Sequence, residues 1–490
     1  MPSAKLTVIA KEPIGTISPL IHGQFAEHLG RCCYDGLWVG KESSIPNVNG
    51  FAKDVLEALK KVNVSMLRWP GGCFADSYHW RDGIGPTEKR PKTLGESCGL
   101  RVVETNELGT HEFIWLCRQL GAEPYLAGNV GSGTPQEMAD WLHYCNSDLD
   151  TDLVALRKAN GHAETMNVKY WGVGNENWGC GGNYDPEGYG KEYRRYATFL
   201  KQTDDRAELV ACGLADRQWN LKLVETLRNH PFLVDHLSVH RYYSGGKAAE
   251  YDDGEYWDIM KGALEVEEDL QYSSEILNFF FAGRKKVGVA MDEWGVWHPE
   301  ATSDKNYEAP STLRDAVAAA AVLDVFQKRC DVVSMANLAQ IVNVLQCLIQ
   351  TDGPNMWVTP TYHLFAIYSP HQGAQAVRVD LETEQVELKD ETKVGVVSAS
   401  ASVKDGKLTV SASNRHPSEP MDLEIAIIGA SVLEGSAELL SGDSPKACNS
   451  ASEPDRVSVA SAPVAGGTRV RAVLPPCSVQ TMVWPCVPAF

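Results

Sequence analysis

The chain is long enough for two or three domains, and its charge excludes several classes of partner. It has 490 residues, an ordinary apolar content of 43% and a formal net charge of -19 at pH 7. Because binding to a phosphate backbone needs a basic face, this acidity argues against nucleic acid as a partner and suits a neutral substrate.

Nothing in the sequence predicts a membrane span, a secretory leader or a metal centre. No apolar run approaches the roughly 18 residues that a membrane span needs, and the N-terminal MPSAKLTVIAKEPIG lacks the basic and apolar segments of a leader. The 13 cysteines are irregularly spaced, without a CxxC pair or a zinc-finger-like His/Cys cluster. We therefore expect reduced, mostly buried thiols and a cytoplasmic protein.

From residue 17 to about residue 370, an apolar strand, a polar loop and a helical stretch alternate eight times. The expected strands are Leu20–Phe25, Val62–Leu67, Pro124–Ala127, the start of Lys169–Gly179, Glu208–Gly213, Val234–Val239, Lys286–Met291 and Val332–Asn337. The expected helices include 51–62, 111–121, 134–145, 221–228, 265–281 and a helix from Arg314. Eight such units predict a (β/α)8 barrel over residues 17–370. A doubly wound sheet is the alternative, but its glycine fingerprint is missing near the first turn.

The texture of the sequence changes after about Pro370. Short alternating segments such as VRVDLE and KLTVSASN fill residues 376–485, separated by Gly, Asp, Asn, Ser and Pro. This pattern is typical of an antiparallel β-sandwich, which we expect to be jelly-roll-like and to cover residues 371–490. Residues 1–16 contain the strand-like KLTVIAK and are expected to add a strand to the same sandwich.

The ends of the predicted barrel strands carry the candidate chemistry, because active sites of such barrels lie at the carboxyl ends of the strands. Glu176 and Glu293 follow strands four and seven, and Glu27 follows strand one. Paired carboxylates near Tyr and Trp side chains predict sugar chemistry, in which one acid protonates a leaving oxygen and the other attacks or stabilises the anomeric carbon. Strand alternation predicts that Asp292, beside Glu293, points away from the barrel mouth.

At these positions the sequence resembles a known family. The segments GQFAEHLG (23–30), RWPGGCFADSYHWRDGIGP (68–86), KYWGVGNENWG (169–179) and VAMDEWGVWH (289–298) are similar to motifs of the glycoside hydrolase family 51 α-L-arabinofuranosidases. The resemblance covers essentially the whole chain. It implies that Glu176 is the general acid/base and Glu293 the nucleophile of a retaining mechanism.

The resemblance also implies a set of substrate-binding side chains. These are Glu27, Arg68, Cys73, Asn175, His240, Tyr242, Trp297 and Gln340. Tyr242 is expected to touch the nucleophile and Trp297 to form an aromatic wall, whereas His240 either contacts the sugar or supports a neighbouring carboxylate. Cys73 stands where many members have Asn, and because a thiol is a weaker donor and acceptor we expect an altered substrate tolerance.

The expected function is an exo-glycosidase that removes terminal α-L-arabinofuranosyl groups from arabinan- or arabinoxylan-derived oligosaccharides, without a metal or cofactor. The alternatives are a β-xylosidase or endo-β-glucanase with the same machinery, and a carbohydrate-binding protein without catalysis. By resemblance we expect a homo-oligomer, with a hexamer as one form. Segments 81–105 and 298–310 are expected to shape the leaving-group side.

Overall fold

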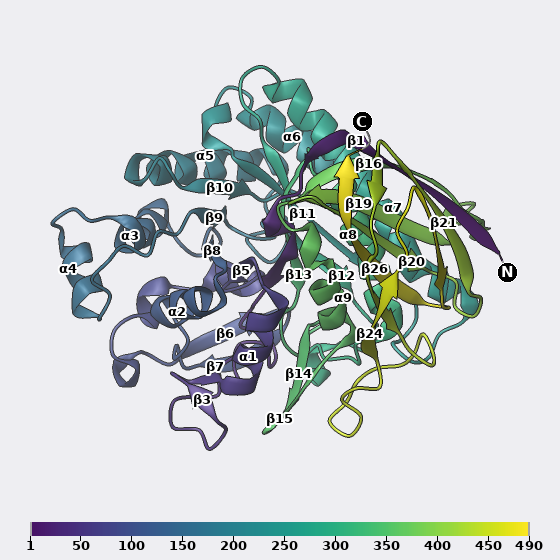
Figure 1. The fold of residues 1–490 in the computed structure, drawn as a ribbon. Coiled ribbons are helices and arrows are strands. Elements are labelled where there is room, and N and C mark those ends of the chain that lie inside the picture. The colour runs from purple at the N-terminus through teal and green to yellow at the C-terminus, as the bar shows by residue number, and fades with distance from the viewer. Residues whose placement is uncertain (1, 489–490) are drawn as a thin grey trace.

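The computed structural model describes residues 2–488, which form a closed parallel barrel and a domain of mostly antiparallel strands (Figure 1). Around the barrel the strand order is β10-β11-β12-β13-β2-β5-β8-β9. The barrel strands are β2 (Gly23–Phe25), β5 (Met66–Trp69), β8 (Glu123–Gly128), β9 (Tyr170–Val173), β10 (Glu208–Ala211), β11 (His236–Tyr243), β12 (Gly288–Val296) and β13 (Val333–Ala339). Each of the eight overlaps a predicted strand, although β5 begins four residues later than expected, and the barrel prediction is confirmed.

The helices follow the barrel strands in alternation. They are α1 (Lys53–Val62), α2 (Thr110–Leu120), α3 (Pro135–Asn146), α4 (Asp152–Ala159), α5 (Pro186–Thr203), α6 (Arg217–Leu227), α7 (Asp253–Phe281), α8 (Leu313–Lys328) and α9 (Pro360–Tyr368). The sequence did not predict α4, α5 and α9. The hydroxyl of Thr134 accepts a hydrogen bond from the N–H of Glu137, which caps α3 as expected for this residue type. Within residues 2–488, no helix is long and apolar enough to cross a membrane.

The C-terminal strands form one hydrogen-bonded sheet in the order β24-β23-β26-β20-β19-β16-β1-β21-β25, with β22 paired to β26. They are β16 (Gln375–Glu382), β19 (Val397–Lys404), β20 (Lys407–Asn414), β21 (Met421–Ile428), β22 (Ala430–Val432), β23 (Gly435–Ser441), β24 (Ser458–Val464), β25 (Arg469–Leu474) and β26 (Ser478–Pro488). Strand β1 (Ser3–Thr16) lies between β16 and β21, and from its end the chain runs into the barrel (Figure 1). Met1 and residues 489–490, at the ends of the predicted sandwich segments, lie outside the described residues.

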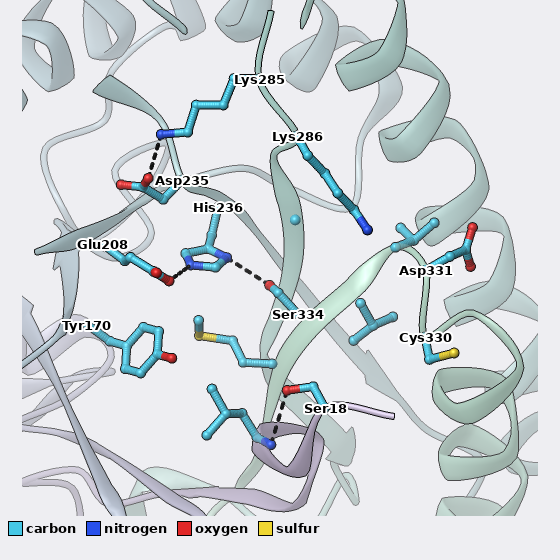
Figure 2. Close-up of a pocket in the computed structure, with 15 residues that line it drawn as sticks. Ser18, Tyr170, Glu208, Asp235, His236, Lys285, Lys286, Cys330, Asp331 and Ser334 are labelled. Carbon is cyan, nitrogen blue, oxygen red and sulfur yellow. Dashed lines mark hydrogen bonds and ion pairs between the residues drawn. The ribbon is translucent and has the colours of Figure 1, made fainter. Parts of the chain in front are cut away.

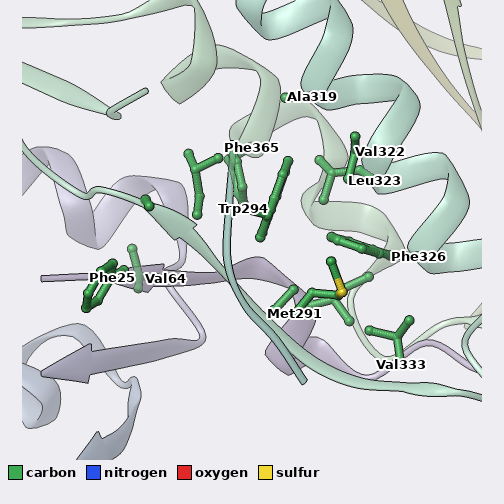
Figure 3. Close-up of a cluster of buried hydrophobic side chains, with 14 of the residues drawn as sticks. Phe25, Val64, Met291, Trp294, Ala319, Val322, Leu323, Phe326, Val333 and Phe365 are labelled. Atoms are coloured by element: carbon green, nitrogen blue, oxygen red, sulfur yellow. The ribbon is translucent and has the colours of Figure 1, made fainter. Parts of the chain in front are cut away.

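Helices α8 and α9 pack against the outer side of strand β12. The ring of Trp294 meets that of Phe326 edge to face at 5.3 Å and lies 6.3 Å from that of Phe365 (Figure 3). On α8, buried Asp324 accepts hydrogen bonds from Ser398 (2.7 Å) and Ser400 (2.6 Å) of β19. The strand that carries Glu293 is thus held from outside by helices that also contact the second domain.

Four short strand pairs extend from this framework. They are β3–β4 (Asn47–Val48 and Phe51–Ala52), β6–β7 (Thr93–Ser97 and Leu100–Glu104), β14–β15 (Ile349–Asp352 and Asn355–Val358) and β17–β18 (Gln385–Glu387 and Lys393–Gly395). The β6–β7 hairpin lies within the long segment after β5. At its turn, the carbonyl of Cys98 accepts a hydrogen bond from the hydroxyl of Tyr307, which lies in the long segment after β12. The two segments expected to shape the leaving-group side therefore touch one another.

Candidate active site

The two carboxylates predicted to act on substrate meet at the carboxyl ends of β9 and β12. Glu176, His240 and Glu293 each offer a polar atom, and these atoms lie within 4.8 Å of one another. The Nδ1 atom of His240 lies 2.8 Å from Oε1 of Glu176 and 3.4 Å from Oε2 of Glu293. A closest approach of single oxygens within 4.8 Å is shorter than the about 6.5–9.5 Å between the carboxyl groups of inverting glycosidases, and it agrees with the closer pairs, about 5–5.5 Å apart, of retaining ones.

Glu293 is fixed by two further hydrogen bonds. Nη1 of Arg68 donates to its Oε1 at 2.7 Å, and the hydroxyl of Tyr242 donates to its Oε2 at 2.9 Å. Burial alone would lower the pKa of Arg68, but the charges of Asp292 and Glu293 raise it, so the guanidinium stays charged. These charge-assisted bonds orient both oxygens of Glu293.

Asp292 lies inside the barrel, and the prediction that it points away from the mouth is wrong. Ala290 pairs with Ser238 and Glu293 pairs with His240, so β12 contains one more residue than β11 in this stretch. Such a bulge breaks the alternation of side chains. The carboxylate of Asp292 is therefore buried, and it accepts hydrogen bonds from Ser238 (2.5 Å) and Tyr125 (2.7 Å).

His240 lies between carboxylates on both sides of its ring. Its Nδ1 faces Glu176, as described above, and its Nε2 lies 3.3 Å from Oδ1 of Asp292. Burial alone would lower the pKa of His240, but the charges of Glu293, Asp292 and Glu176 raise it to about 10. The ring is thus an imidazolium that holds Glu176 in place from below, which is one of the two roles expected for it.

Glu27 occupies the strand-one side of the site. Its Oε1 accepts hydrogen bonds from the hydroxyl of Ser97 (2.8 Å) and the N–H of Phe74 (3.2 Å), and its Oε2 accepts from the amide of Gln340 (3.0 Å). Burial, followed by the charge of Glu293, raises the pKa of Glu27 to about 7. A Cβ at Gly72 would lie 2.6 Å from Oε1 of Glu27, so the glycine allows the close approach of this loop.

Asn175, beside Glu176, is held by two charged groups. Its Oδ1 accepts from Nη2 of Arg68 at 2.5 Å, and its backbone N–H donates to Oδ2 of Asp76 at 3.0 Å. The other oxygen of Asp76 accepts from the N–H groups of Val130 and Gly131. Sequence reasoning missed Asp76, although an acid within the RWPGGCFAD segment was a signal. This buried carboxylate joins the loops after β5, β8 and β9.

Cys73 corrects two predictions, because it forms a disulfide with Cys180. Cys73 begins the short helix after β5, and Cys180 lies four residues after Glu176, so the two loops meet beside the barrel mouth with a Cα–Cα distance of 5.6 Å. A bridged sulfur has no S–H, and Cys73 therefore cannot donate to a sugar hydroxyl as expected. Nor are all the cysteines reduced, although the other eleven are free thiols.

Aromatic rings line the site next to Glu293. The ring of Trp297 meets Tyr242 edge to face at 5.1 Å and Tyr307 at 5.7 Å. The indole N–H of Trp297 donates to the carbonyl of Ala301 at 3.1 Å, which fixes its orientation. Such rings suit the apolar face of a sugar, and the role of Trp297 as an aromatic wall stays a prediction.

Three polar atoms among the cluster residues described above are buried and make no hydrogen bond to the protein. They are Nδ2 of Asn175, Oε1 of Gln340 and Nε of Arg68, and the last of these lies 3.8 Å from Oδ2 of Asp292. An unsatisfied buried group costs about 1–3 kcal/mol, so a folded protein rarely keeps one without a use for it. The free donor on Asn175 and the free acceptor on Gln340 are suited to hydroxyl groups of a bound sugar.

A second cavity of about 470 Å³ lies at the opposite end of the barrel (Figure 2). There His236 bridges Glu208 (2.9 Å) and Ser334 (2.8 Å), and Asp235 pairs with Lys285 at 2.5 Å. These residues belong to the amino-terminal ends of the strands, where barrel residues contribute to stability and not to catalysis. The candidate active site is therefore the carboxylate cluster.

A closed eight-stranded parallel barrel with paired carboxylates at the ends of β9 and β12 is the framework of a retaining glycoside hydrolase. Residues 58–261 match the family model described as an alpha-L-arabinofuranosidase 1 domain, and residues 292–478 match the alpha-L-arabinofuranosidase C-terminal domain. The chain belongs to the glycoside hydrolase family 51 α-L-arabinofuranosidases.

Individual relatives support this assignment over the whole chain. An intracellular exo-alpha-L-arabinofuranosidase of Bacteroides ovatus is 43% identical over 466 residues, which are 93% of this chain and 90% of that protein. The crystal structure of a GH51 arabinofuranosidase from Xanthomonas axonopodis pv. citri is 36% identical and superposes with a TM-score of 0.93, covering 99% of this chain and 100% of that chain. The arabinose complex of an alpha-L-arabinofuranosidase from Thermotoga maritima is 33% identical, with a TM-score of 0.88 over 99% and 100% of the two chains.

Proposed function

We propose that this protein removes terminal, non-reducing α-L-arabinofuranosyl groups from arabinan- or arabinoxylan-derived oligosaccharides, with retention of configuration. The observation that carries the proposal is the placement of Glu176 and Glu293 within 4.8 Å of one another at the barrel mouth. Family membership supports the choice of an arabinofuranoside as substrate.

In the first step, protonated Glu176 gives its proton to the leaving oxygen while Glu293 attacks the anomeric carbon. The bond to the leaving group breaks, and a covalent glycosyl-enzyme forms. Arg68 and Tyr242 hold the attacking carboxylate through the hydrogen bonds described above. Glu176 is the more accessible of the two acids, with 19% of its side chain exposed against 6% for Glu293. The greater exposure of Glu176 suits an acid/base, which must contact both a leaving oxygen and a water molecule.

In the second step, Glu176 is a carboxylate and accepts a proton from the attacking water. The water oxygen bonds to the anomeric carbon, Glu293 leaves, and the sugar is released with its original anomeric configuration. Asn175, Glu27 and Gln340 surround the position of the sugar and offer partners for its hydroxyl groups. We assign sugar-binding roles to these three residues and to Trp297.

Two variants test the assignment of the carboxylates. Glu293→Gln should abolish turnover of an aryl α-L-arabinofuranoside, because the amide cannot form the glycosyl ester. Glu176→Ala should lose much more activity on alkyl or sugar leaving groups than on a good aryl leaving group, which needs little protonation. Substantial turnover by Glu293→Gln, or equal losses of Glu176→Ala on every substrate, would contradict these roles. NMR of the first released anomer tests retention.

A panel of aryl glycosides separates this proposal from its alternatives. Faster hydrolysis of β-D-xylosides or β-glucans than of α-L-arabinofuranosides would favour a β-xylosidase or an endo-β-glucanase. Tight binding of sugars without product release would favour a carbohydrate-binding protein.

We also propose a cytoplasmic location and a homo-oligomer. The location is supported by the intracellular relative from Bacteroides ovatus. Cell fractionation tests it, and recovery of the protein outside the cytoplasm would contradict it. Light scattering tests the assembly, and a single species of 53.7 kDa, the mass of one chain, would contradict a homo-oligomer.

A further inference from the structure

The disulfide between Cys73 and Cys180 lies directly beside the proposed acid/base. The Sγ atom of Cys180 is 4.0 Å from Oε2 of Glu176. The two Sγ atoms and one carboxylate oxygen of Glu176 all lie within 4.8 Å of one another. Cys180 is exposed and Cys73 is half-buried, so reagents in solution can reach the bridge.

Reduction of this bridge would place two thiols next to a carboxylate. A water-soluble phosphine breaks the S–S bond, is oxidised to the phosphine oxide with the oxygen of one water molecule, and leaves both sulfurs as thiols that carry the protons of that water. In a reducing cytoplasm, the dithiol is the form that cellular reductants favour. The loops after β5 and β9 then keep the two sulfurs close, because Asp76 joins these loops independently of the bridge.

Two thiolates and one carboxylate form a ligand set for a thiophilic divalent cation. Soft sulfur ligands select Zn²⁺ over Mg²⁺ or Ca²⁺, and Zn²⁺ takes a tetrahedral set of sulfur, nitrogen and oxygen ligands. Three protein ligands leave the fourth position to water. The thiols lose their protons when the metal binds, so binding strengthens as pH rises.

We propose that reduction converts the Cys73–Cys180 bridge into a Zn²⁺ site, completed by Glu176, whose occupation stops hydrolysis. A carboxylate bound to Zn²⁺ can neither donate a proton to the leaving oxygen nor accept one from water. The bridged form has no thiolate to offer and resists the metal. The inhibitory part of this proposal rests on the proposed role of Glu176, whereas the metal site itself does not.

A rival cation site exists at Glu176, His240 and Glu293, whose ligand atoms also lie within 4.8 Å. It is disfavoured because it offers no thiolate, the ligand type that a thiophilic cation such as Zn²⁺ prefers to carboxylate oxygen. The guanidinium of Arg68, 2.7 Å from Glu293, adds repulsion. The rival site contains no sulfur and does not depend on the redox state, so experiment can separate the two.

The test is a Zn²⁺ titration of aryl α-L-arabinofuranoside hydrolysis by the full chain. It compares oxidised protein with protein that has been reduced by phosphine and desalted without oxygen. Removing a group that only hydrogen-bonds a metal ligand already lowers metal affinity about 10–100-fold. Reduction supplies two direct ligands, so it should lower the half-inhibiting Zn²⁺ concentration at least about 100-fold. Cys180→Ser, which has lost one sulfur, should resist Zn²⁺ under both conditions. Cys330→Ser, which removes a free thiol beside the cavity at the opposite end of the barrel, should behave as the unmodified protein does.

Equal Zn²⁺ sensitivity of oxidised and reduced protein, or of reduced Cys180→Ser and the reduced unmodified protein, would overturn the proposal in favour of the rival site. Binding of Co²⁺ gives a readout that needs no turnover, because thiolate ligands produce a charge-transfer absorption in the near ultraviolet. The reduced protein should show this absorption and reduced Cys180→Ser should not. Absorption without any hydrolysis would mean that the proposed function fails while the site stands. Hydrolysis with neither absorption nor Zn²⁺ inhibition would mean that the metal site fails while the proposed function stands.

Discussion

Replacement of His240 by Gln tests how the buried charges govern the acid/base. The imidazolium lies 2.8 Å from Oε1 of Glu176 and also faces Asp292 and Glu293. Gln keeps a hydrogen-bonding side chain in the same place and removes the positive charge. Because that charge attracts three buried carboxylates, its loss should weaken both the positioning of Glu176 and the stability of the folded protein.

The size of the effect follows from Coulomb's law. Two unit charges 4 Å apart interact by about 4 kcal/mol at an effective dielectric constant of 20. Loss of the imidazolium removes such an attraction from Glu176, and the side chain of Glu176 loses its fixed position. We therefore expect kcat/KM of His240→Gln to fall at least about tenfold, which corresponds to about 1.4 kcal/mol of transition-state stabilisation.

The raised pKa of His240 also determines how the stability of the folded protein depends on pH. The pKa of His240 is raised to about 10 in the folded protein, from 6.5. The stabilisation it contributes is therefore complete below about pH 6.5 and disappears as pH rises through 10. Breaking a buried ion pair costs about 3–5 kcal/mol, so His240→Gln should be less stable than the unmodified protein at pH 6, and the difference should shrink towards pH 10.

Kinetics from pH 5 to 10 and urea unfolding at several pH values measure both effects. His236→Gln is the matched control, because His236 lies at the other end of β11 and bonds only Glu208 and Ser334. It should leave kcat/KM unchanged. Full kcat/KM in a folded His240→Gln, or the same loss in His236→Gln, would refute the electrostatic reasoning.

Three further changes have defined outcomes. Arg68→Lys loses the planar guanidinium that donates to both Glu293 and Asn175, so kcat/KM should fall at least about tenfold. The free energy of unfolding in urea should fall by about 1.5–3 kcal/mol. Full activity would contradict this prediction. The pKa of Glu27 is raised to about 7, so the folded protein binds an extra proton between about pH 4.5 and 7 and loses stability as pH rises through that window; Glu27→Gln should lose this slope in urea titrations. Tyr307→Phe breaks the contact with the Cys98 carbonyl, so the KM for oligosaccharides should rise while aryl arabinofuranosides are little affected; equal changes on both substrates would argue against a leaving-group role.

The barrel was predictable because its signal is repetitive and local. Each of the eight strands is an apolar run followed by a polar turn, and the carboxyl ends of parallel strands meet at one edge. The end of β9 therefore had to lie near the end of β12, and Glu176 and Glu293 meet as expected. Helices α4, α5 and α9 were not predicted. The apolar periodicity of α9 is weak, whereas that of α5 is stronger than that of the predicted α3 and could have been recognised.

What the sequence could not supply was the orientation of side chains where the regular geometry fails. Alternation along a strand places Asp292 outside, and only the extra residue in β12 turns both Asp292 and Glu293 inward. No residue type in that stretch of the sequence predicts a bulge. Likewise, Cys73 and Cys180 are 107 residues apart, and their pairing depends on how two loops cross above the barrel.

The β6–β7 hairpin links the choice of sugar to the choice of leaving group. Ser97, at its inner end, donates to Glu27 on the sugar side, and the next residue, Cys98, accepts from Tyr307 of the segment after β12. A movement of this hairpin that widens the leaving-group side must therefore also withdraw a donor from Glu27. Because burial already raises the pKa of Glu27, the loss of a hydrogen bond that favours its ionised form would shift it further towards protonation. Changes in this hairpin should therefore alter substrate range and pH dependence together.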